Sequence, residues 1–193
     1  MIGKARRWWA PVVLGLGMCI LAIDGSADQT DPRLNGLFEE LRAATDQDSA
    51  DRIEAQIWKI WLATPDSVTA ANLKAARAAA AKGDYDTALA EAGKALHGAP
   101  TYAEAWNVHG TLLYETGDFQ GSLADIEQTL KLEPRHFGAL AGRGLCYMQM
   151  GDNVKALAAF EQALAIYPRQ PVARVYADTL RREQSRAADN AGR

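Results

Sequence analysis

The sequence is poor in the residues that build disulfides and metal sites. Its 193 residues include two cysteines and three histidines. Cys19 lies in the N-terminal segment, so only Cys146 would remain if that segment were removed, which excludes an intramolecular disulfide in the remaining chain. His97, His109 and His136 lack the close histidine or cysteine neighbours that a metal site needs. We therefore expect no metal and no bound cofactor, and we interpret Cys146 as a small buried apolar residue.

Further absences narrow the class of function. The Gly142-Arg143-Gly144 run lacks the Lys-Ser/Thr ending of a phosphate loop, and no Ser-His-Asp or Cys-His arrangement can be nominated, so we expect no enzyme. The net charge of −3 at pH 7 offers no electrostatic footprint for nucleic acid. Removing residues 1–27, which carry three cations and one aspartate, would change it to −5. Apolar and polar residues do not alternate over strand lengths, which predicts essentially no β-structure.

What the sequence does contain is a period of 34 residues. Gly-Asp pairs recur at Gly83-Asp84, Gly117-Asp118 and Gly151-Asp152, and prolines keep the same register at Pro100, Pro134 and Pro168. A fixed period of this length indicates a repeat of helix pairs. Glycine can take a positive φ and end the first helix of a pair, aspartate can cap the second, and proline stops that second helix.

The last full repeat fits a known pattern at many positions. Counted from Phe137 as position 1, the residues at positions 4, 8, 11, 15, 20, 24, 27 and 32 are Leu140, Gly144, Tyr147, Gly151, Ala156, Phe160, Ala163 and Pro168. These are positions that the tetratricopeptide repeat consensus fixes, so the sequence resembles that family over residues 69–168. The first repeat matches least, with Asn72, Ala79 and Ala92 at positions 4, 11 and 24. The resemblance implies an all-α fold, a right-handed α-solenoid of helix pairs.

The period divides the chain into seven segments. We expect a signal peptide or N-terminal anchor at 1–27, a degenerate helical pair at 31–64, repeats at 69–102, 103–136 and 137–170, a C-terminal capping helix at 171–186 and a disordered tail at 187–193. The degenerate pair lacks the Gly-Asp turn, and we expect it to cap the N-terminal end of the array. Its Trp58 and Trp61 are interpreted as core residues rather than as a ligand-stacking pair.

The first 27 residues have the pattern of an export signal. Lys4, Arg6 and Arg7 precede an apolar run at residues 8–23, and small residues precede a possible cut after Ala27. This pattern is typical of a secretory signal peptide and predicts a periplasmic or secreted protein. The alternative is an uncleaved anchor facing the periplasm, although the run is shorter than the ~20 residues that comfortably span a bilayer.

The resemblance places the binding surface on the concave face, which the first helix of each repeat lines. The candidate groove residues there are Leu73, Arg77, Glu104, Asn107, Thr111, Tyr114, Leu145 and Met148. The co-chaperone version of this face clamps a carboxylate with basic residues and asparagines at set positions. This sequence has Leu73, Arg77, Val108, Gly138 and Gly142 there, and Arg77 alone cannot form that clamp. We therefore expect an extended or helical partner segment with apolar side chains.

Taken together, these features predict a non-catalytic interaction scaffold or adaptor of the bacterial envelope, in which the concave face binds an as yet unidentified protein or peptide. We expect a monomer that contacts a membrane only through an uncleaved N-terminal segment. The alternative function is a structural subunit of a larger membrane-associated complex that recognises no free peptide.

Overall fold

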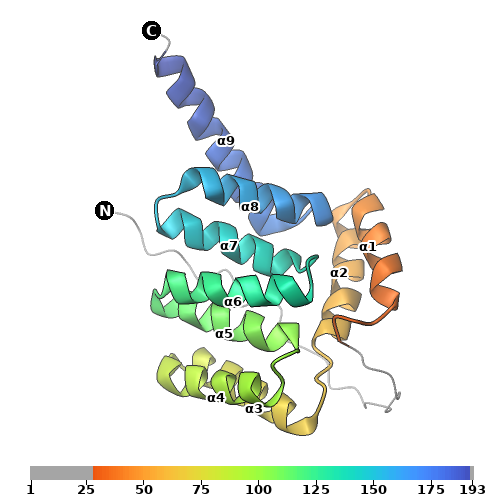
Figure 1. Cartoon of the computed structure of the whole chain (residues 1–193). Helices are drawn as coiled ribbons and strands as arrows, with labels where there is room; N and C mark the ends of the chain where they lie inside the picture. The colour runs from red at the N-terminus through yellow and green to blue at the C-terminus, as the bar shows by residue number, and fades with distance from the viewer. Residues whose placement is uncertain (1–27, 192–193) are drawn as a thin grey trace.

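The computed structural model describes residues 28–191 (Figure 1). The predicted signal at 1–27 and the last two residues of the predicted tail lie outside this range. The described chain forms nine helices and no strand. They are α1 (Arg33–Ala43), α2 (Gln47–Trp61), α3 (Ser67–Ala81), α4 (Tyr85–Gly98), α5 (Ala103–Thr116), α6 (Phe119–Leu132), α7 (Phe137–Gln149), α8 (Asn153–Ile166) and α9 (Pro171–Ala191). None of these helices is both long and apolar enough to cross a membrane.

The Gly-Asp pairs form the turns inside the repeats, as predicted. Gly83, Gly117 and Gly151 have φ values of 81°, 86° and 78°, in the left-handed region that favours glycine. Each following aspartate accepts a hydrogen bond from the backbone N–H three residues on and so caps the second helix of its pair. The pairs α3–α4, α5–α6 and α7–α8 stack in chain order (Figure 1).

Close helix contact within a pair depends on small residues. A Cβ atom placed on Gly144 of α7 would lie 2.5 Å from Cε1 of Phe160 on α8, so any other residue would require the Phe160 ring to move. Ala156 and Ala163 of α8 are fully buried beside Phe160. The small residues at positions 8, 20 and 27 of the last repeat therefore lie around the large Phe160 side chain at position 24.

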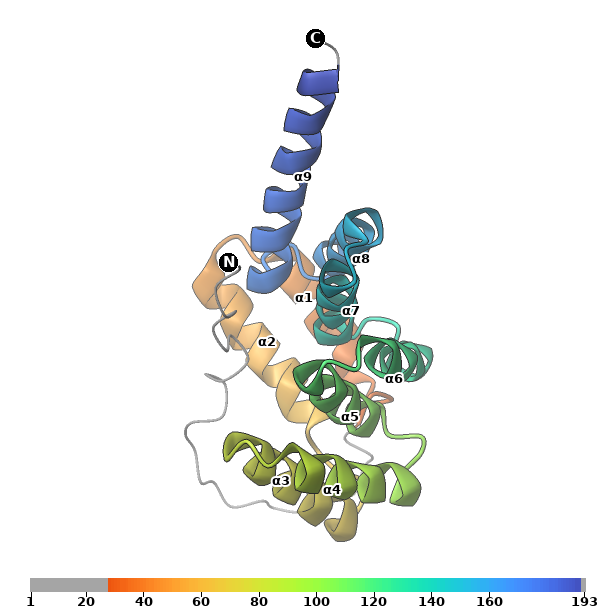
Figure 2. The ribbon, with the colours of Figure 1, turned by 90° about the vertical axis from the view of Figure 1, so that its left-hand side faces the viewer.

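The helical pair α1–α2 does not cap the N-terminal end of the array, and this expectation was wrong. The pair instead crosses the turns that join successive repeats. The Tyr102 hydroxyl donates to the carbonyl oxygen of Trp61 at 2.5 Å, Arg135 donates to Asn35 at 2.8 Å, and Arg169 donates to the carbonyl of Ala44. Figure 2 shows α2 running beside α5 and α7.

Aromatic packing explains this position. Phe38, Trp58 and Trp61 of the pair surround Phe137 at the start of α7, with ring centroids 5.1 to 6.5 Å from it. Tyr167, at the end of α8, completes the cluster at 5.3 Å from Phe137. The rings of α1–α2 bury more apolar surface against Phe137 and Tyr167 than they could against the alanine-rich outer face of α3.

Consequently, no helix of the described residues 28–191 covers the outer face of α3. Ala71 and Ala78, at positions 3 and 10 of the first repeat, are exposed. In the next two repeats the same positions are buried by the preceding helix pair: Ala105, Leu112, Ala139 and Cys146.

The C-terminal helix is longer than predicted. Ala173, Ala177 and Leu180 of α9 are buried against α7 and α8, which confirms a helix that covers this end of the array. The helix continues to Ala191, so residues 187–191 are helical rather than disordered. Arg181 pairs with Glu161 on α8 and Asp178 on α9. Beyond it the exposed helix projects from the body (Figure 2).

Candidate functional site

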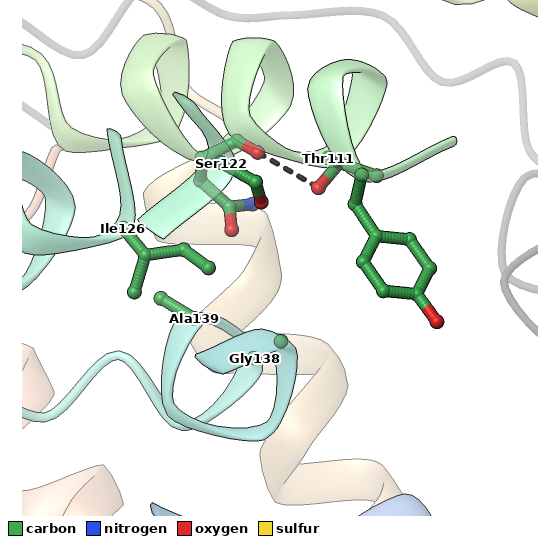
Figure 3. A pocket seen from close by; sticks show the side chains of 8 residues that line it. Thr111, Ser122, Ile126, Gly138 and Ala139 are labelled. Atoms are coloured by element: carbon green, nitrogen blue, oxygen red, sulfur yellow. Dashed lines mark hydrogen bonds between the residues drawn. The ribbon is translucent and has the colours of Figure 1, made fainter. Parts of the chain in front are cut away.

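A small pocket opens between α5, α6 and α7 on the predicted binding face. It is lined by Asn107, Thr111, Tyr114, Ser122, Ile126, Gly138, Ala139 and Gly142 (Figure 3). Its volume of about 10 Å³ admits no more than about one water molecule. Figure 3 shows Thr111 on one side, Gly138 and Ala139 on the other, and Ile126 facing the space between them. Three of the eight candidate groove residues meet at this pocket.

The other candidates are divided between surface and core. Arg77 and Met148 are partly exposed. Leu73, Glu104 and Leu145 are buried, with exposed fractions of 0%, 4% and 7%. Leu73 packs between the first two repeats, and Leu145 packs in the core that α9 completes. These two side chains therefore stabilise the array and offer little surface to a partner.

Glu104 is the centre of a buried polar cluster. Its Oε1 accepts from Arg77 Nη2 at 3.0 Å, and its Oε2 accepts from Asn107 Nδ2 at 2.9 Å. The Nε2 of His136 lies 3.4 Å from the same Oε2. A buried carboxylate is costly unless it is paired and hydrogen-bonded, and these partners fulfil that condition.

The tautomer of His136 follows from its contacts. Its Nδ1 accepts the backbone N–H of Ala139 at 3.0 Å and thereby caps α7. A ring nitrogen that accepts carries no proton, so in the neutral ring Nε2 carries it and points it at Glu104. The imidazole is fully buried and stacks on Trp61 at 4.2 Å between centroids, with 6° between the planes.

The helix α2 closes one side of the concave face. Trp58 packs on Gly138, where a Cβ atom would lie 3.3 Å from the indole. Trp58 Nε1 donates to Glu54 Oε1 at 3.1 Å, and Tyr167 donates to Glu54 Oε2 at 3.1 Å. Burial raises the pKa of the Glu54 carboxyl, while these two hydrogen bonds lower it by a smaller amount.

Sequence reasoning missed the role of His136 and assigned Glu104 to the wrong environment. The helical period puts Glu104 at a position that faces the groove, but it cannot show that Arg77 and His136 contact it there. A histidine directly before the first residue of a helix was the available signal, because Nδ1 can cap the helix there.

The remaining reactive side chains are used in packing. Cys146 is fully buried and donates to Ser122 Oγ at 3.3 Å, and burial raises the pKa of its thiol, which keeps it in the unreactive form. His109 contacts Asp125 at 2.5 Å, consistent with a packed histidine. In the described part of the chain no three histidine, cysteine or acidic side chains gather to hold a metal ion.

Comparisons with known proteins agree with this geometry. The family model of the tetratricopeptide repeat matches residues 107–171, from the middle of α5 to the start of α9. A comparison with curated proteins finds no match.

Solved tetratricopeptide domains share the fold at low sequence identity. That of Sgt2 from Aspergillus fumigatus is 20% identical, with a TM-score of 0.61 over 66% of this chain and 86% of that one. That of Arabidopsis OM64 is 19% identical, with a TM-score of 0.58 over 60% and 96%. The first such domain of Spaghetti (RPAP3), bound to the HSP90 peptide SRMEEVD, is 16% identical, with a TM-score of 0.59 over 62% and 96%. The chain therefore has the all-α tetratricopeptide repeat fold, which in general is a non-catalytic scaffold for protein–protein interaction.

Proposed function

We propose that this protein is an exported adaptor that binds a protein segment on the open part of its concave face. The observation that carries the proposal is the pocket between α5 and α7, where Asn107, Thr111 and Tyr114 meet two glycines of α7. Gly142 has no side chain that would fill this pocket, whereas the space beside Gly138 is taken by Trp58. Beside them, Met148 is partly exposed and offers apolar contact to a partner side chain.

The test is to block the pocket without removing a contact that holds the fold. Thr111→Arg places a long side chain in the pocket mouth, and Ala124→Arg, on the exposed surface of α6, is the matched control. Immobilised wild-type protein and the control should retain the same protein from an envelope extract, and Thr111→Arg should lose it. If both variants retain the partner protein equally and have equal melting temperatures, the binding site does not lie on the concave face.

The export signal is tested by intact-mass measurement of the purified protein. Cleavage after Ala27 predicts a species that begins at Asp28 and stays in the periplasmic fraction without detergent. A full-length species that sediments with membranes would establish the anchored alternative.

The second candidate function is a structural subunit of a larger assembly, and the uncovered outer face of α3 favours it. Light scattering after size exclusion of residues 28–193 separates the two. We expect a monomer for the adaptor, whereas an obligate larger species would favour the subunit.

A further inference from the structure

The carboxylate of Glu104 is held in the way that a bound ligand is held. Three donors converge on it from separate parts of the array: Arg77 from α3, Asn107 from α5 and His136 from the start of α7. Both oxygens are engaged, and the Glu104 side chain is 5% exposed. In the described chain, Glu104 is the only carboxylate that pairs with Arg77.

The cluster would keep its donors if the carboxylate were absent. His136 is fixed by its cap to Ala139 and by its stack on Trp61, neither of which involves Glu104. Arg77 lies at the mouth, with 38% of its side chain exposed, whereas the His136 side chain closes the inner end with 0% exposed. A cation and two neutral donors around one buried point form a site for a carboxylate, because charge-assisted hydrogen bonds in such a place are strong.

We infer that Glu104 is an internal carboxylate that fills a latent carboxylate-binding site and so determines which segments the concave face accepts. Because Arg77, Asn107 and His136 already converge on the Glu104 carboxylate, its negative charge disfavours an acidic side chain or a free chain end at this end of the groove. The partner class is therefore an uncharged or basic segment, and this last statement alone rests on the proposed function.

The experiment empties the site and supplies a small carboxylate. Glu104→Ala should be destabilised in chloride buffer, and sodium acetate at ~100 mM should raise its Tm by about 2 to 4 °C relative to sodium chloride of equal ionic strength. Wild-type protein should show no such difference. Acetamide, which has the same size and no charge, should not replace acetate, and adding Arg77→Met to Glu104→Ala should abolish the acetate effect.

Two results would overturn the inference: no acetate-dependent rise in Glu104→Ala, or an equal rise in wild type. If Glu104→Ala does not fold, a cycle of Glu104→Gln and Arg77→Met decides instead. The stability loss in the double variant should then be smaller than the sum of the two single losses. Glu104→Gln alone leaves the Arg77 cation facing a neutral amide, and Arg77→Met removes that cation. Additive losses would overturn the inference. None of these measurements uses a protein partner, so their failure is distinguishable from failure to capture one.

Discussion

At the residue scale, the tightest constraint in the array is the missing side chain at Gly144. We expect Gly144→Leu to lower the free energy of unfolding by about 1 to 3 kcal/mol or more, because the new side chain must displace Phe160. Urea denaturation measures the change. Gly93→Leu is the control, since a Cβ atom there meets nothing within 4 Å and a helix gains from replacing glycine. Equal losses in the two variants would contradict the assigned register.

Glu54 gives the stability a defined dependence on pH. Its folded pKa is raised above the ordinary value of 4.5 by burial, so folding favours the protonated carboxyl. Its stabilising contribution is complete below the unfolded pKa and is lost as the pH rises through the folded pKa. Glu54→Gln should therefore gain stability relative to wild type as the pH rises from roughly 4 to 7, measured by urea midpoints. Glu40→Gln, on the exposed surface of α1, is the matched control for the substitution itself. A difference between Glu54→Gln and wild type that does not change with pH would contradict this assignment.

Residues at consensus positions were predictable because their environment repeats along the chain. The turn glycines, the capping aspartates and the Gly144 contact all lie within one repeat or between successive repeats. Glu104 and His136 were not predictable, because Glu104 contacts His136 across 32 positions of the sequence, and His136 in turn stacks on Trp61, which is 75 residues away. A helical period shows which residues share a face, but it does not show what covers that face.

At the scale of the element, α2 is held to the array mainly by Trp61. This side chain is 1% exposed and contacts rings of Phe38, His136 and Phe137. Trp61→Ala should cost about 3 to 5 kcal/mol of unfolding free energy, measured by chemical denaturation. Leu62→Ala, one residue on and 44% exposed, should change stability by no more than about 0.5 kcal/mol. A similar small effect of both would mean that α2 does not dock as described.

The projecting end of α9 should contribute nothing to the stability of the body. Residues 183–190 are all exposed, so a chain that ends at Arg182 should unfold within about 0.5 kcal/mol of the full-length protein. Leu180→Ala is the comparison, since Leu180 is 2% exposed and its loss should cost about 2 to 5 kcal/mol. Thermal denaturation of both proteins makes the measurement. A large loss on truncation would show that the exposed end has a partner in solution.

At the scale of the whole molecule, the local order of the repeats was predictable and the placement of the first helical pair was not. The 34-residue period of the sequence predicts the three helix pairs. Their stacking follows because no single pair can bury its own apolar face. The position of α1–α2 depends on rings brought together from distant segments. Its helices were recognisable from periodicity, but periodicity contains no information about which part of the array they contact.

That placement has a consequence for the order of events during synthesis. A plain repeat array has only near-neighbour contacts, so its early repeats can fold before its late ones exist. Here the first two helices contact residues as far on as Arg169, which hydrogen-bonds to Ala44 across 125 positions. They leave the ribosome before the repeats do, yet their aromatic face is covered only when the last repeat has been made. The chain therefore has a higher contact order than its repeats suggest, with slower folding and an interval of exposed apolar surface that chaperones can bind.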